Sequence, residues 1–101
     1  MKRYRVRFAR SAREDLDRLT EHLVEKSPDR AGDAERAIRD AVEVLKRLPL
    51  LGPQARDQDD RALRELLVPF GTSGYLLLYR VGPGALVSVL AARHQVEERF
   101  H

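Results

Sequence analysis

The chain has 101 residues, no cysteine and a formal net charge of +3 at neutral pH. A chain of this length has room for one hydrophobic core, so we expect a single domain over residues 1–101. The lack of cysteine excludes disulfides and thiolate metal sites, and no apolar run approaches the ~20 residues of a membrane-spanning helix. No signal-peptide pattern opens the sequence, and we expect a cytoplasmic protein that binds no membrane, no metal and no cofactor.

The first predicted element is a half-buried strand over residues 4–8. Tyr4, Val6 and Phe8 occur at every second position, which is the period of a strand with one apolar face. Arginines take the alternate positions and continue just beyond the strand: Arg3, Arg5, Arg7, Arg10 and Arg13. A basic run of this kind is either a solvated surface or a surface that attracts an acidic partner, and both interpretations remain open.

Two amphipathic helices are predicted next. Ser11 and Glu14 form a capping-box pattern, and leucines at spacings of three and four continue the first helix to about Lys26. Ser27-Pro28 places proline at the first position of a second helix, which should end before Pro49. The short break indicates an antiparallel hairpin, in which alanines early in the second helix allow close approach.

The last third of the chain changes to strand periodicity. Residues 49–61 are rich in proline, glycine and polar side chains, which predicts a long surface loop. Three strands should follow over residues 63–69, 75–81 and 85–93, joined by glycine-containing turns into an antiparallel meander. The predicted fold class is α/β (α+β), with order β-α-α-β-β-β and the helical hairpin packed on a mostly antiparallel sheet.

The strand over residues 75–81 should be central in this sheet. Tyr75 and Tyr79 share one of its sides, and strand alternation favours burial of that side over a role in nucleotide stacking. Arg80 lies in otherwise apolar surroundings and must reach solvent or a carboxylate, because an unpaired buried charge is costly.

The arrangement of the chain resembles the RelE/ParE superfamily of bacterial toxins over essentially its whole length. The residues that carry the resemblance are the opening segments Tyr4–Phe8 and Ala12–Leu16, the central segments Leu63–Tyr75 and Leu78–Val81, and the end of the last strand, Leu90–Gln95. The resemblance implies the toxin of a type II toxin–antitoxin system, neutralised by a cognate antitoxin, ParD-like or similar, that folds on binding. ParE-like members poison DNA gyrase without cleaving anything themselves, whereas RelE-like members cleave mRNA on the ribosome. Fold alone therefore leaves open whether the chain is an enzyme.

Cleavage of RNA through its 2′-hydroxyl requires a base, an acid and cations for the phosphate. In a nuclease, the candidate phosphate ligands are Arg64, Arg80 and Arg93, and His94 is the best proton carrier. Structural roles compete with these: a salt bridge to an acidic helix residue for Arg64, and a hydrogen bond at the strand end for His94.

The resemblance also implies two departures from the RNA-cleaving members. These carry a tyrosine near the C-terminus, where this chain has Phe100, and a phenyl ring transfers no proton. They also carry several basic residues around the central hairpin, which here is entered through apolar Val68–Gly71. Both departures favour a ParE-like inhibitor of DNA gyrase and replication, with ribosome-dependent mRNA cleavage as the alternative. A third possibility is a chain that has lost toxicity and only binds its antitoxin.

Residues that could bind the target or the antitoxin lie along the whole chain. The candidates are Arg3, Arg5, Arg7, Arg10, Arg13, Phe70, Arg93, His94 and Phe100. Further apolar residues fall in loops or strand ends that we expect the core not to reach: Leu50, Leu51, Val68 and Phe70. We therefore expect an apolar groove on the sheet and hairpin that an antitoxin helix fills.

Overall fold

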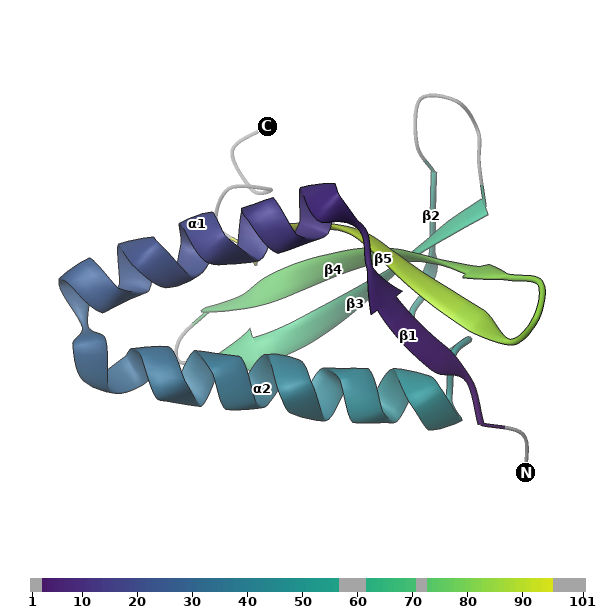
Figure 1. Cartoon of the computed structure of the whole chain (residues 1–101), viewed down its shortest axis with the longest axis horizontal. Coiled ribbons are helices and arrows are strands. Elements are labelled where there is room, and N and C mark those ends of the chain that lie inside the picture. Colours follow the sequence, from purple (N-terminus) through teal and green to yellow (C-terminus); the bar gives the residue numbers. More distant parts are fainter. Residues whose placement is uncertain (1–2, 57–61, 71–72, 96–101) are drawn as a thin grey trace.

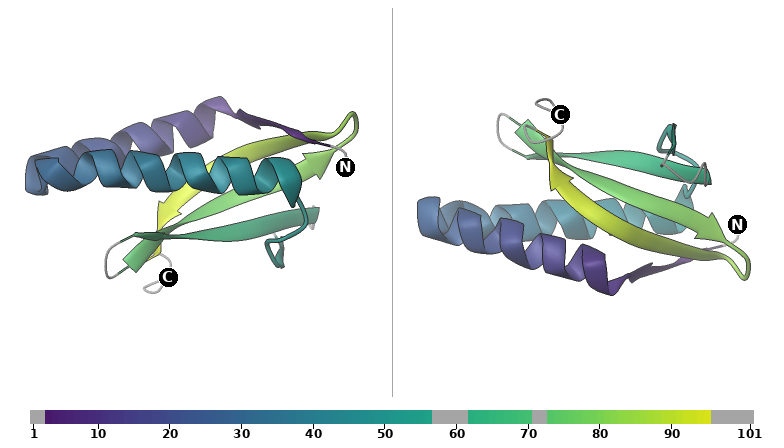
Figure 2. Two further views of the ribbon diagram at one scale, coloured as in Figure 1. Left: turned by 90° about the horizontal axis from the view of Figure 1, so that it is seen from below. Right: turned by 90° about the horizontal axis from the view of Figure 1, so that it is seen from above.

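The computed structural model describes residues 3–56, 62–70 and 73–95, and in them two helices cover one face of a five-stranded sheet (Figures 1 and 2). The elements are β1 (Arg5–Phe8), α1 (Arg10–Lys26), α2 (Pro28–Arg47), β2 (Gln54–Arg56), β3 (Ala62–Phe70), β4 (Ser73–Gly82) and β5 (Leu86–His94). The strand order across the sheet is β1-β5-β4-β3-β2, with β1 parallel to β5 and all other pairs antiparallel. The predicted fold and element order are confirmed, and short β2 is an addition inside the predicted loop.

The helical hairpin turns at a single residue, Ser27, so α1 and α2 lie side by side in opposite directions (Figure 1). Pro28 is the first residue of α2, as predicted. Ala34 and Ala41 of α2 are buried in the core together with Ala12 and Leu19 of α1. The three small alanine side chains allow the helices to pack closely over the sheet.

The predicted capping box at Ser11 is wrong. Helix α1 begins at Arg10, so its N-cap residue is Ala9, two residues before Ser11, and Ala9 provides no side-chain hydrogen bond. The Ser11 hydroxyl instead donates to the carbonyl of Leu90 in β5, at 2.7 Å. The hydroxyl therefore ties the helix to the sheet and leaves the first amides of α1 without a side-chain cap.

The core lies between the helices and one face of β3, β4 and β5. Tyr75 and Tyr79 are buried on this face, as predicted, and Leu77 between them is fully buried. The intervening side chains of β4 point to the opposite, open face, where Leu76 and Leu78 are half-buried and Arg80 is exposed. Arg80 thus reaches solvent, one of the two outcomes that its sequence position predicts.

Two expectations for β3 are corrected. Val68, expected at the margin of the core, is only 2% exposed because it pairs with buried Tyr75 on the covered face. The strand also does not end at Pro69 but continues to Phe70. The Glu65 amide donates to the Pro53 carbonyl, on the side of β3 that faces β2 and not β4. Because amides alternate in direction along a strand, the nitrogen of Pro69 points to this same side. Short β2 pairs only with the first residues of β3, so a proline, which has no amide hydrogen, costs no strand-pairing bond there.

Helix α1 continues the edge of β5 where β1 ends. The last backbone bond on this side joins the Ala9 amide to the Val89 carbonyl, at 2.8 Å. Beyond it, Ser11 binds the Leu90 carbonyl, and the Ala92 amide donates to Asp15 Oδ2 at 3.0 Å. Two side chains one helical turn apart therefore take the place of a neighbouring strand.

Candidate functional site

The open face of the sheet is basic. Arg5 and Arg7 are exposed on β1, while Val6 and Phe8 between them are half-buried, which confirms the predicted alternation. Arg7 pairs with Ser88 of β5, and Ser88 pairs with Arg80 of β4, so these side chains form one row across three strands. Within the row, Arg7 Nε donates to Ser88 Oγ at 3.1 Å.

Arg93 lies on the same open face, opposite Leu76. With Glu65, Leu76 and Leu78 it lines a small hollow of ≈ 20 Å³, too small for a nucleotide. Among the described residues, the open face therefore presents guanidinium groups around a small hollow.

Arg64 is not part of this basic face. It pairs with Tyr79 and so belongs to the covered side of the sheet. Its Nη1 donates to the backbone carbonyls of Gly52, at 2.8 Å, and Leu50, at 3.3 Å. The predicted salt bridge to an acidic helix residue is absent from the described residues, because backbone carbonyls of the preceding loop accept from this guanidinium instead.

His94 lies on the opposite face of β5 from Arg93. It pairs with Tyr75, and the two rings meet edge to face with centroids 5.8 Å apart. Tyr75 stacks on Phe70 at 5.7 Å, and the Arg30 guanidinium lies 4.9 Å from the centre of the Phe70 ring. The structure thus brings together Phe70 and His94, two of the predicted binding residues, but it separates His94 from Arg93. Burial raises the pKa of the Tyr75 phenol, which keeps this ring neutral.

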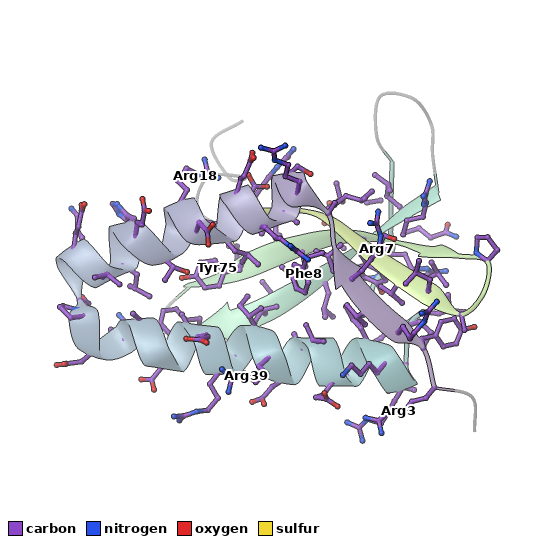
Figure 3. All side chains as sticks on the ribbon, viewed as in Figure 1. Arg3, Arg7, Phe8, Arg18, Arg39 and Tyr75 are labelled. Atoms are coloured by element: carbon purple, nitrogen blue, oxygen red, sulfur yellow. The ribbon has the colours of Figure 1, made fainter. Side chains whose placement is uncertain are left out.

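An apolar groove of ≈ 390 Å³ opens between the two helices, above Tyr75 (Figure 3). Its apolar lining is Leu16, Leu19, Ala34, Ile38 and Tyr75. Asp17, Thr20, Glu21 and Glu35 complete it, so its polar side chains include three carboxylates. The sequence analysis also predicted an apolar groove, but it assigned Leu50, Leu51, Val68 and Phe70 to it, and none of these residues lines the groove. Leu16 and Leu19 were missed because their helical spacing indicated core positions.

A second hollow, of ≈ 550 Å³, lies where α1 leaves the edge strand β1. Arg7 and Arg13 line it together with Val6, Phe8 and Leu16. Asp17 completes the lining, so two of the predicted partner-binding arginines border a recess that is half apolar and half charged.

The other N-terminal arginines have local partners. Arg3 binds Glu43 at 2.9 Å and Arg10 binds Glu14 at 3.2 Å, both at exposed positions. Phe100, the remaining candidate, lies outside the described residues. Within the ranges that the structure describes, no three carboxylate or imidazole side chains are grouped to hold a metal ion, and no helix is long and apolar enough to cross a membrane.

Comparison with known proteins gives one family. Residues 6–99 match the family model described as the ParE toxin of the type II toxin–antitoxin system parDE. Among curated proteins, the chain is similar to Toxin RelE3 of Caulobacter vibrioides, with 37% identity over 93% of this chain and 97% of that toxin. It is also similar to Toxin RelE1 of the same organism, with 32% identity over 87% of this chain and 89% of the relative.

Two solved structures share the fold. One is of a chromosomal ParDE toxin–antitoxin system from P. aeruginosa, with a TM-score of 0.71 and 21% identity over 93% of this chain and 98% of that chain. The other is the toxin–antitoxin complex RelBE2 from Mycobacterium tuberculosis, with a TM-score of 0.59 and 28% identity over 91% of this chain and 98% of that chain.

Proposed function

Since the chain belongs to the ParE toxin family of type II toxin–antitoxin systems, within the RelE/ParE superfamily, we propose that it arrests growth by binding and trapping DNA gyrase in the cytoplasm. In this account the chain performs no proton transfer, and its toxicity depends on binding surfaces alone. The DNA strand break that the trapped complex holds open belongs to the topoisomerase.

This proposal rests mainly on one observation: two of the three arginines that a ribonuclease could use to hold the phosphate lie on a different face of the sheet from the histidine that would transfer a proton. Arg80 and Arg93 lie on the open face of the sheet, while His94 packs against Tyr75 on the covered face. The Arg64 guanidinium binds two carbonyls of its own chain. A ribonuclease needs a proton carrier within hydrogen-bond reach of the phosphate that its cations hold. The described candidates do not provide that arrangement.

Ribosome-dependent mRNA cleavage is the alternative function. The row of Arg7, Ser88 and Arg80 favours it, because exposed guanidinium groups on one sheet face suit a phosphate backbone. Both curated relatives also carry the name RelE toxin. In this alternative the proton carrier would have to come from His94 or from residues after it.

The groove between the helices is our proposed antitoxin site. Its five apolar side chains suit the apolar face of an amphipathic helix, and the carboxylates of Asp17, Glu21 and Glu35 suit basic residues beside that face. An antitoxin segment that is disordered alone would fold in the groove, which makes neutralisation dependent on apolar contact.

The substitution His94→Gln separates the two functions. Glutamine keeps much of the shape of histidine and one hydrogen bond but transfers no proton. We expect toxicity close to that of the parent at matched expression, and no cut mRNA by primer extension in either strain. A nuclease that uses His94 would lose roughly 10²–10⁴-fold in cleavage. Loss of both toxicity and mRNA cuts in a folded His94→Gln protein would contradict the gyrase proposal.

A further inference from the structure

Three leucines form an exposed apolar patch where α2 runs into the following loop. Leu48 is 53% exposed, Leu50 62% and Leu51 55%, more than any other large hydrophobic residue among those the structure describes. We call these three residues the leucine patch. Neighbouring apolar side chains that all face water are typical of a surface that another molecule covers.

The loop that carries the leucine patch has a fixed shape. The Leu51 amide donates to the Leu48 carbonyl at 3.1 Å and closes a turn. The buried Tyr79 hydroxyl donates to the Pro49 carbonyl at 2.8 Å and accepts from the Gly52 amide at 3.0 Å. A side chain at Gly52 would place its Cβ 2.7 Å from the same hydroxyl, so only glycine allows this approach.

Arg64 fixes the loop from the other side, through the carbonyls of Leu50 and Gly52. With the bonds from Tyr79, backbone groups of residues 49, 50 and 52 are held by side chains of the central sheet. The leucines are thus presented on a preorganised backbone, which lowers the entropy cost of binding.

Among the described residues, the charges around the leucine patch are mainly positive. Lys46 and Arg47 form the basic last turn of α2, and Arg3 lies beside them through its bond to Glu43. Lys46 lowers the pKa of Glu43 through its hydrogen bond and its positive charge, and Arg3 adds a smaller effect of the same kind. Glu43 therefore remains an ionised carboxylate that is paired with both cations. The Lys46 carbonyl also accepts from the Tyr4 amide at 2.8 Å, which holds the N-terminal segment against this end of α2.

The leucine patch and the groove suit different partners. Each leucine exposes more than half of its surface, so the patch stands out from the molecule, whereas the groove receives a segment. From Ile38 in the groove to Leu48 is ten residues, or about 15 Å along the axis of α2. A protruding, preorganised patch fits a pocket of a folded protein, whereas a disordered segment folds into a groove.

We propose that the leucine patch is the surface through which the chain docks into an apolar, acid-rimmed pocket on its folded target protein. This inference rests on the proposed function, in which the chain traps its target by binding. It assigns target binding to the loop after α2 and leaves the groove to the antitoxin.

The test combines Leu50→Ser and Leu51→Ser in one variant. A matched control combines Val24→Ser and Leu67→Ser, which removes two apolar side chains of comparable exposure, 47% and 45%, from other surfaces. Both proteins are compared with the parent for growth arrest in cells, for trapping of cleaved DNA with purified DNA gyrase, and for affinity to the cognate antitoxin. Thermal unfolding verifies that each variant is folded.

We expect the patch variant to lose at least about tenfold in gyrase trapping and in toxicity, because two apolar anchors leave the interface. Its antitoxin affinity should equal that of the parent, and the control should match the parent in every assay. Unchanged toxicity of the patch variant would overturn the inference, as would an equal loss in the control or a parallel loss of antitoxin affinity.

Failure of the proposed function gives a different result. If the parent traps no cleaved DNA but the patch variant alone loses toxicity and keeps its antitoxin affinity, the target is not gyrase. The assignment of the leucine patch to target binding then stands on a different folded target.

Discussion

Tyr79 is the residue that connects the core to the proposed target surface. Its ring is fully buried among core residues, and its hydroxyl binds the Pro49 carbonyl and the Gly52 amide. Strand alternation is sufficient to predict that this ring is buried. The hydrogen bonds could not be predicted, because they join residues 27 and 30 positions apart whose approach depends on how the loop folds back.

The substitution Tyr79→Phe should destabilise the chain and loosen the loop. It leaves the buried Gly52 amide and the partly buried Pro49 carbonyl without their partner, which costs about 1–3 kcal/mol of unfolding free energy. The matched control is Tyr75→Phe, because the Tyr75 hydroxyl makes no hydrogen bond to another described residue. Urea unfolding measures the stability, and hydrogen exchange of the Gly52 amide measures the loop. Equal stability of the two variants would show that the hydroxyl of Tyr79 does not hold the loop.

The basic residues show where prediction from sequence stops. The alternation in β1 placed Arg5 and Arg7 correctly on the exposed side. The same pattern did not predict that Arg3 and Arg10 form ion pairs, with Glu43 and Glu14 respectively. Ion pairs depend on which elements meet in space, and a local pattern of charges does not contain that information.

At the scale of elements, the helices and the meander follow from hydrophobic period and turn residues. The main departures occur at element ends, where partners from other elements compete. The Ser11 hydroxyl, in a capping pattern by sequence, binds the Leu90 carbonyl of β5. Asp15 binds the Ala92 amide one turn later, so α1 covers a strand edge that would otherwise attract another chain.

The groove between α1 and α2 allows a test of antitoxin binding. Thr20 is exposed and lines the groove, so Thr20→Trp fills part of its ≈ 390 Å³ from a position outside the core. We expect a fall of at least about tenfold in antitoxin affinity by calorimetry, because a helix can no longer reach the apolar lining. His22→Trp places the same side chain at an exposed position of the same helix, outside the groove lining, and should leave the affinity unchanged. Tight binding by the Thr20→Trp variant would assign the antitoxin to another surface.

At the scale of the whole molecule, the fold separates three surfaces. The helical hairpin lies on one side of the sheet (Figure 2) and contains the groove, and the opposite face presents Arg5, Arg7, Arg80 and Arg93. The leucine patch lies at the far end of α2 from the hairpin turn, near the N-terminal segment. The sequence identified the toxin fold and most of the basic residues. Two leucines of the patch, Leu50 and Leu51, were also expected from the sequence to lie outside the core, whereas the groove appears only when α1, α2 and β4 are assembled.

The most direct test of the proposed function measures which process stops first after the toxin is expressed without its antitoxin. Cells are pulse-labelled with thymidine and with methionine at short intervals, and DNA breaks are scored in the same samples. We predict that DNA synthesis falls first, that breaks accumulate, and that protein synthesis declines only later. An immediate stop of protein synthesis with intact DNA and continuing replication would contradict the gyrase proposal and favour mRNA cleavage.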